Sequence, residues 1–281
     1  MILMARLNRS DSRAGYHASF SGSLATSVRS VISEGGYALQ FFMGNPRSYH
    51  ASSLTENDVK LTKLLVDRFP TTIVAHAPYP VFAATAADNP PCHSNLVSEL
   101  TTMAQFPQSG VVVHVGSNSS GKKIAQSVDS VLNAVKSDSP RMVLENGAGA
   151  GHQYGVTLEE LGAIRRHTQH QDNLFFCLDT AHLYASGAYD LRRNEEVDQL
   201  FRDAQKYLGG WESVFVVHLN DSKTAYKSRS DRHASLGEGE IWGKSTGSLR
   251  YLLDRIGGTP FILETPNTEA DWRWLQRWNY A

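Results

Sequence analysis

Cysteine is scarce in this sequence, which contains only Cys92 and Cys177 among 281 residues. So low a number excludes a zinc site built from cysteines alone. Cys177 lies in the apolar run 174–178, where we expect a buried free thiol because free cysteine packs as a small hydrophobic side chain. A metal site in this protein would therefore use nitrogen and oxygen ligands.

Long hydrophobic runs are also absent, since the longest contain four to six residues and a membrane span needs about 20. The first four residues are apolar, but Ala5 and Arg6 follow at once, so the beginning lacks the apolar segment of a secretory signal. We therefore expect an intracellular protein that makes no use of a membrane, in the cytoplasm or nucleus according to the host.

Net charge is close to zero, at -1, whereas binding to nucleic acid usually shows as a basic surface. Any affinity for nucleic acid must therefore be local. Hydrophobic residues make up 41% of the chain and charged residues 20%, which is enough for a large core and gives no sign of disorder.

Eight short apolar runs are present, and most are apolar throughout rather than alternating, as strands buried on both faces should be. They lie at 15–17, 38–43, 72–75, 111–113, 141–144, 174–178, 214–217 and 260–263. The segments between them are helical in character, at 54–69, 124–135, 161–167, 195–208 and 249–256. Thr157 and Glu160 form a capping box before one of these segments. The alternation predicts an α/β fold, a single (β/α)8 TIM barrel over 15–281, after an N-terminal leader at 1–14.

Potential metal ligands end six consecutive runs, and the carboxyl ends of parallel barrel strands converge on one mouth. These residues are His76, His114, Glu145, Asp179, His218 and Glu264. Three further candidates, His182, Asp231 and His233, lie just beyond strand ends. Asp231 and His233 are two apart, so in extended backbone they share a face and can hold one ion together.

Nine such side chains at one mouth predict bound metal, because ionisable groups buried without partners cost several kcal/mol each. Five histidines, two glutamates and two aspartates suit zinc, with manganese or iron as poorer alternatives. If one carboxylate bridges, nine ligands leave room for three metals with open positions. Sites with several metals suit the cleavage of phosphate esters.

Four sequence strings closely resemble signatures of the endonuclease IV family. They are Leu144–Asn146, Leu178–His182, His218–Lys223 and Ser230–Gly239. The resemblance runs from about Gly15 to about Glu264, and residues of the appropriate type fill all nine positions where that family places zinc ligands.

That resemblance implies three zinc ions per chain. His76, His114 and Glu145 would hold the first. Glu145, Asp179, His218 and Glu264 would hold the second, and His182, Asp231 and His233 the third. Glu145 and Glu264 would be the catalytic residues.

The implied activity is hydrolysis of the phosphodiester 5′ to an abasic site, with removal of blocking groups from 3′ ends, in base excision repair. The partner would be double-stranded DNA that carries such lesions, and we expect a monomer.

Several residues are candidates for DNA contact. The segment Asn45–Tyr49 looks like the family's first recognition loop, with Arg47 where the lesion is entered and Tyr49 beside it; a solvated turn is the alternative. Tyr79 matches the aromatic residue of the next loop, but Pro80–Ala83 departs from the leucine and asparagine usual there. Lys223 and Arg232 lie close in sequence to ligands, where they would hold phosphates or form a solvated charged loop.

Two other functions fit the same pattern. Sugar isomerases and epimerases share the barrel and its acids at strand ends, but they need one or two metals, which leaves no role for His182, Asp231 and His233. A module that binds DNA lesions without cutting would keep the barrel but not a complete ligand set.

Overall fold

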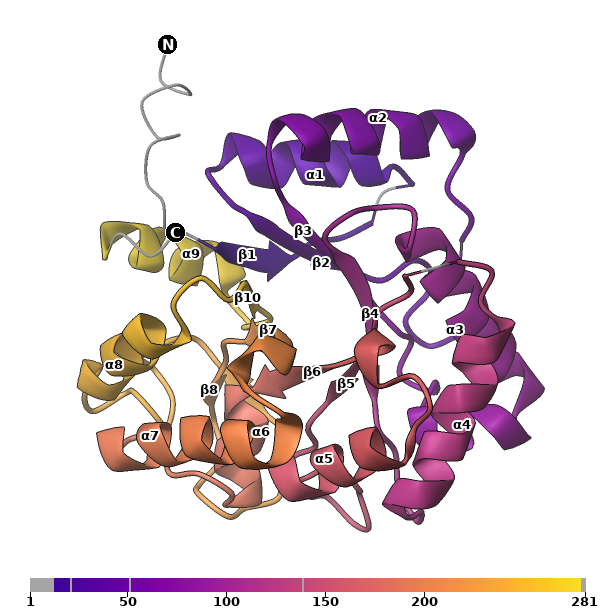
Figure 1. Ribbon diagram of the computed structural model, residues 1–281. Helices are drawn as coiled ribbons and strands as arrows, with labels where there is room; N and C mark the ends of the chain where they lie inside the picture. Colours follow the sequence, from indigo (N-terminus) through magenta and orange to yellow (C-terminus); the bar gives the residue numbers. More distant parts are fainter. Residues whose placement is uncertain (1–12, 21, 51, 138, 279–281) are drawn as a thin grey trace.

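The computed structural model describes residues 13–20, 22–50, 52–137 and 139–278. Eight parallel strands form a closed barrel in the order β1-β10-β7-β6-β5-β4-β3-β2, and helices surround it (Figure 1). The strands are β1 (Ala14–His17), β2 (Ala38–Phe41), β3 (Thr72–His76), β4 (Ser109–His114), β5 (Met142–Glu145), β6 (Leu174–Asp179), β7 (Val214–His218) and β10 (Phe261–Leu263). The predicted (β/α)8 barrel is confirmed.

Each expected apolar run became one barrel strand, and the differences lie at the ends. β1 begins at Ala14, one residue inside the segment expected to be a leader; residues 1–12 of that segment lie outside the described residues. β3 to β7 each extend at the carboxyl end to include the polar residue that follows the apolar run. A short antiparallel pair, β8 (Asp221–Ser222) and β9 (His233–Ala234), follows β7.

The helices include the five expected segments and four that the pattern did not indicate. They are α1 (Leu24–Ser33), α2 (Glu56–Arg68), α3 (Pro90–Met103), α4 (Gly121–Ala134), α5 (Leu158–His167), α6 (Thr180–Ser186), α7 (Asn194–Asp203), α8 (Gly247–Ile256) and α9 (Thr268–Arg277). The Thr157 and Glu160 capping box before α5 is confirmed. α1, α3, α6 and α9 were missed. Among the described residues, no helix is long and apolar enough to cross a membrane.

α3 and α6 show why local pattern was insufficient. α3 opens with two prolines, which usually mark turns but are tolerated in a first helical turn, and Asn89 caps it by accepting from Cys92 N. α6 has only seven residues and starts directly after β6, where Asp179 caps it. No loop signal separates that strand from that helix.

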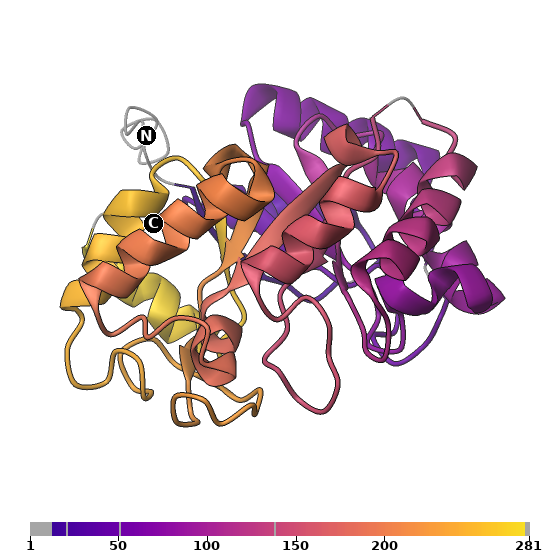
Figure 2. The ribbon, with the colours of Figure 1, turned by 60° about the horizontal axis from the view of Figure 1, so that its bottom comes forward.

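The interior of the barrel holds a small apolar layer, separate from the larger core between strands and helices. It consists of Ala38, Val74, Val112, Val143, Cys177, Val216 and Ile262. Cys177 is free and buried, as predicted. On β1, Gly15 takes the corresponding place, because a Cβ there would lie 1.8 Å from Ala38 O. Beyond β5 and β7, loops 146–157 and 219–246 protrude on the same side of the barrel (Figure 2).

A buried acid on α3 supports the loop that follows β2. Asn95 Nδ2 donates to Tyr49 O at 3.1 Å and lies 3.5 Å from Glu99 Oε1. Glu99 is fully buried, and its Oε2 has no hydrogen-bond partner. Burial raises the pKa of Glu99 to about 8, so the folded protein holds this carboxyl in its neutral form at pH 7.

We predict that Glu99→Gln stabilises the protein more at pH 8 than at pH 5. The unfolded chain loses the Glu99 proton near the ordinary pKa of 4.5, whereas the folded chain keeps it up to about 8. The free energy of unfolding therefore falls as the pH rises between these values, and glutamine removes this loss. Thermal melts of both proteins across this range test it. A difference in Tm that does not change with pH would contradict the assignment.

Candidate metal centre

The candidate ligands reach the mouth of the barrel through the alternation of side chains along each strand. On six strands, the second residue after the apolar residue of the interior layer is a candidate ligand. These ligands are His76, His114, Glu145, Asp179, His218 and, just after β10, Glu264. On β1, the second residue after Gly15 is His17, and on β2 the second residue after Ala38 is Gln40. All eight strands thus place a polar side chain in one ring.

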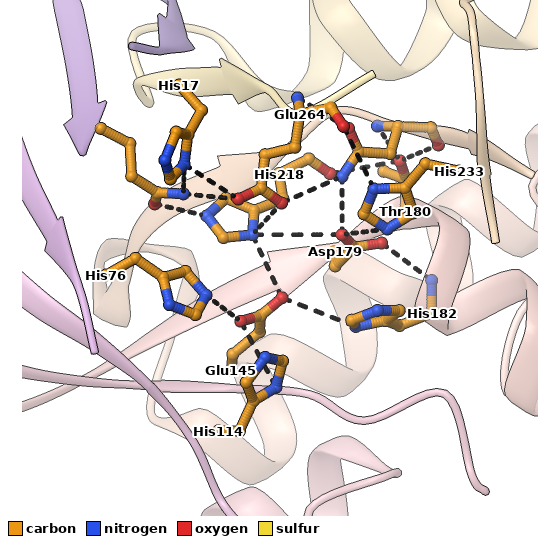
Figure 3. A network of polar contacts seen from close by, with 12 residues as sticks. His17, His76, His114, Glu145, Asp179, Thr180, His182, His218, His233 and Glu264 are labelled. Carbon is orange, nitrogen blue, oxygen red and sulfur yellow. Dashed lines mark hydrogen bonds and ion pairs between the residues drawn. The ribbon is translucent and has the colours of Figure 1, made fainter. Parts of the chain in front are cut away.

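These side chains surround a cavity of about 580 Å³. Seven of the nine candidate ligands line it, together with His17, whereas Asp179 and His218 are 0% exposed and are not among the lining residues. Figure 3 shows the histidine and carboxylate side chains converging. The structure thus gathers all nine candidates, drawn from six strand ends, α6 and the loop around β9.

A first ligand group consists of His76, His114 and Glu145, whose ligand atoms lie within 4.8 Å of one another. Glu145 Oε2 is 3.3 Å from His76 Nε2 and 3.6 Å from His114 Nδ1. His76 Nδ1 donates to Ala77 O at 2.7 Å. A metal-binding histidine commonly donates its other ring N–H in this way, which fixes the ring orientation. Here the bond turns Nε2 towards the carboxylate of Glu145.

A second ligand group consists of Glu145, Asp179, His218 and Glu264, also within 4.8 Å. His218 Nδ1 lies 3.1 Å from Glu145 Oε1 and 3.1 Å from Glu264 Oε2, and 4.0 Å from Asp179 Oδ2. Glu145 belongs to both groups, and its two oxygens face different ones. Its position is that of a bridging carboxylate.

The third ligand group joins α6 to the loop after β7. His182 Nε2 is 3.2 Å from one oxygen of Asp231, and His233 Nε2 is 3.3 Å from the other. Asp179 Oδ2 also lies 3.4 Å from His233 Nε2, so Asp179 belongs to the second group and adjoins the third. Asp231 is the most open of the nine, with 52% of its side chain exposed.

The residues of this centre fit metal ions. Nε2 of His182 and Nε2 of His233 are buried but have no hydrogen-bond partner, which is rare for buried polar atoms in proteins. Both nitrogens face carboxylates, and imidazole with carboxylate is a donor set that suits zinc. A cation between them would complete the contacts that the protein leaves open.

Electrostatics in the centre favour ionised carboxylates. Burial works to raise the pKa of Glu145, but His114, His218 and His76 outweigh it and hold that pKa well below its ordinary value. His218 and His17 do the same for the pKa of Glu264. Metal ligands must be deprotonated, and these two acids are so at neutral pH.

Three amide side chains hold the ligands in place, and ligand spacing alone did not indicate them. Gln40 Nε2 donates to Glu264 Oε1 at 2.5 Å, and Gln40 Oε1 lies 2.8 Å from His218 Nε2. Asn220 Nδ2 donates to Asp179 Oδ2 at 2.7 Å, and Asn146 Oδ1 accepts from Asp179 N at 2.7 Å. Counting alternate residues on all eight strands would have found Gln40 and His17; only the three-dimensional contacts reveal the two asparagines.

The candidates for DNA contact are arranged unevenly. Tyr79, Lys223 and Arg232 line the cavity. Arg47 is exposed on the neighbouring loop, which Tyr79 N joins by donating to Pro46 O at 2.8 Å. Tyr49 instead packs against the hydrophobic core and is not among the residues that line the cavity.

The sequence and the fold of this chain are both similar to those of known proteins. The family model of the xylose isomerase-like TIM barrel matches residues 29–280. Proteins named "Probable endonuclease 4" from Halothermothrix orenii and Nitrosopumilus maritimus are each 34% identical to this chain, covering 90% of it and 93% and 92% of their own lengths. The crystal structure of endonuclease IV from Thermus thermophilus superposes with a TM-score of 0.81 at 31% identity, covering 94% of this chain and 96% of that one.

The chain therefore belongs to the endonuclease IV family. It is a hydrolase of the endonuclease IV type. A D-tagatose 3-epimerase-like protein has the same fold, with a TM-score of 0.65, but only 19% identity.

We predict that Gln40→Leu weakens metal binding. Leucine is of similar size but leaves Glu264 Oε1 and His218 Nε2 without the amide that joins them. Loss of such an outer contact costs about 10- to 100-fold in metal affinity. Zinc retained against a competing chelator measures the effect.

Asn95→Leu is the matched control, because it removes another buried amide that contacts no candidate ligand. Equal zinc retention in wild type and Gln40→Leu would rule out this role for Gln40.

Proposed function

We propose that this protein is a zinc-dependent apurinic/apyrimidinic endonuclease that hydrolyses the phosphodiester 5′ to abasic sites in double-stranded DNA. By the same chemistry it removes blocking groups from 3′ ends, and it acts in base excision repair. The observation that carries the proposal is the joined arrangement of three ligand groups at one mouth. Glu145 belongs to the first two groups, and Asp179 joins the second group to His182 and His233. Asp231 lies 3.2 and 3.3 Å from those two histidines. The relatives named endonuclease 4 support the proposal.

In this proposal three zinc ions occupy the centre. His76, His114 and Glu145 hold the first, and Glu145, Asp179, His218 and Glu264 the second. His182, Asp231 and His233 hold the third, with Asp179 adjoining. Bound zinc would lower the pKa of its water to about 7 and would neutralise charge on the attacking and leaving oxygens. Manganese or iron could replace zinc at some positions.

The two catalytic glutamates have separate tasks. Glu145 is 2% exposed and contacts four histidines, so its task is to set the spacing between the ligand groups. Glu264 lines the cavity and is 17% exposed. Since its pKa is lowered, it remains a carboxylate at neutral pH and orients the attacking water by accepting its hydrogen bond.

The cations at the rim would position the DNA. Lys223 and Arg232 line a cavity otherwise rich in carboxylates, and contacts from such side chains to phosphates set the register of a protein on DNA. Tyr79 is 54% exposed, which leaves its ring free to stack on a base or sugar. Arg47, on the adjoining loop, would enter the lesion. Tyr49 would support that loop from beneath.

If this protein were a sugar isomerase, part of the site would have no function. A free neutral sugar needs neither the third ligand group nor the rim cations Lys223 and Arg232. Because one chain supplies all nine ligands, we propose that the protein acts as a monomer wherever the host keeps its DNA, in the cytoplasm or nucleus.

We predict about three zinc ions per chain and single-turnover cleavage of abasic duplex DNA that leaves a 3′ hydroxyl. Glu264→Gln keeps the shape of the side chain but removes its charge, so the cleavage rate should fall about 10²- to 10⁴-fold while abasic DNA still binds. Glu212→Gln is the matched control, since Glu212 precedes β7 at the opposite end of the barrel, and it should cleave normally. Metal analysis and resolved product ends measure both.

Two results would overturn this function. One is cleavage 3′ to the lesion by β-elimination. The other is full activity in protein stripped of metal by a chelator.

We also predict that Arg47→Ala and Tyr79→Ala weaken binding of abasic DNA while zinc content stays the same. Neither residue belongs to a ligand group, and loss of one stacked aromatic costs about 1–3 kcal/mol. Titration of a fluorescent abasic duplex measures the affinity. Unchanged affinity in either variant would disprove the role of that residue.

A further inference from the structure

The loop after β7 leaves the barrel at β8 and returns at β9, which pairs with β8. β8 and β9 pair with Asp221 opposite Ala234 and Ser222 opposite His233, so residues 223–232 form an excursion closed at its base. Asp231 and His233, two members of the third ligand group, lie at the returning end. The position of that group therefore depends on what holds this base together.

Asp221 holds it. This carboxylate is 0% exposed and accepts five backbone N–H groups. Oδ1 accepts from Ser222 at 2.8 Å and Ile241 at 3.0 Å. Oδ2 accepts from Gly237 at 3.1 Å, Gly239 at 3.1 Å and Trp242 at 3.3 Å. Four of the five donors follow β9, so one side chain ties β8 to the segment beyond β9.

The backbone closes tightly around this carboxylate. A Cβ on Gly239 would lie 2.4 Å from Asp221 Oδ1 and 2.4 Å from Ser222 O. Glu240 N also donates to Ser222 O at 2.6 Å. β9 is therefore paired with β8, and the turn at 237–242 that follows β9 is bound to β8 as well. Both oxygens of Asp221 are occupied, and Asp221 is not among the residues that line the cavity, so it is no metal ligand itself.

The other ligand groups do not share this support. The first and second groups take their side chains from β3 to β7 and from the end of β10. His182 comes from α6, which Asp179 caps by accepting from His182 N at 2.8 Å. Only Asp231 and His233 depend on the closed base of the loop.

We propose that Asp221 is a positioning residue for the third metal: its carboxylate sets Asp231 and His233 against His182, and it has no part in the first two ligand groups. This inference rests on the proposed function for the presence of three zinc ions. It makes the third ion separable from the other two by a substitution that touches no ligand.

Asp221→Asn in the zinc-loaded full chain tests the proposal, because an amide cannot accept at both positions. We expect zinc content after dialysis to fall from about three to about two ions per chain. The zinc concentration that half-fills the third position should rise about 10- to 100-fold. Excess zinc should restore the third ion and, with it, cleavage.

Asp58→Asn is the matched control. Asp58 is a buried carboxylate that accepts from Leu24 N at 2.8 Å and Ala25 N at 3.1 Å, and it joins α1 to α2, which supply no ligand. We expect a lower Tm but an unchanged zinc content. If Asp221→Asn does not fold, Gly239→Ala decides, since it keeps the carboxylate but forces the backbone away from it; the same selective loss of one zinc is expected.

The outcomes separate this inference from the proposed function. Three tightly held zinc ions in wild type and in both loop variants would overturn the inference alone. Loss of all zinc from Asp221→Asn would also overturn it, because Asp221 would then support the whole centre. Two zinc ions in wild type, unchanged in the variants, would overturn the three-metal function and the inference together.

Discussion

The structure of the centre depends on one buried carboxylate, Glu145, whose oxygens lie 3.1 to 3.6 Å from nitrogens of four histidines. An unpaired carboxylate in such a position would cost several kcal/mol, so the surrounding imidazoles compensate its charge, and cations would complete that compensation. The histidines come from β3, β4, α6 and β7. Bringing them together requires a closed barrel, which explains why the site needs nearly the whole chain.

Support for the ligands is of two kinds. The strand-borne ligands are held by the barrel itself and adjusted by amides such as Gln40 and Asn220, which bond to carboxylates without adding charge. The loop-borne ligands Asp231 and His233 belong to no strand of the barrel. In our proposal they depend on Asp221, a buried carboxylate that accepts five backbone N–H groups.

A near-neutral protein can act on a polyanion when its charges are placed unevenly. The net charge is only -1, yet Lys223 and Arg232 stand at the rim of the cavity, where they would meet phosphates first. The carboxylates beneath them would repel DNA if metal ions did not neutralise them. In the proposed function, metal binding and DNA binding would therefore be coupled through charge, although different residues would carry them.

The sequence by itself determined the barrel and its nine candidate ligands. Runs buried on both faces predict parallel strands, and the ends of such strands meet wherever the barrel closes. Tertiary structure alone showed which candidate ligands lie close to one another, because residues such as Asp179 and His233 are distant in sequence and 3.4 Å apart in space. It also decided that Tyr49 packs inward and that Asp221 closes a loop. Both features depend on contacts between segments, which the local sequence pattern of each segment does not indicate. Helices α3 and α6 were missed for a related reason. A cap or a preceding strand, and not hydrophobic periodicity, determines where each of them begins.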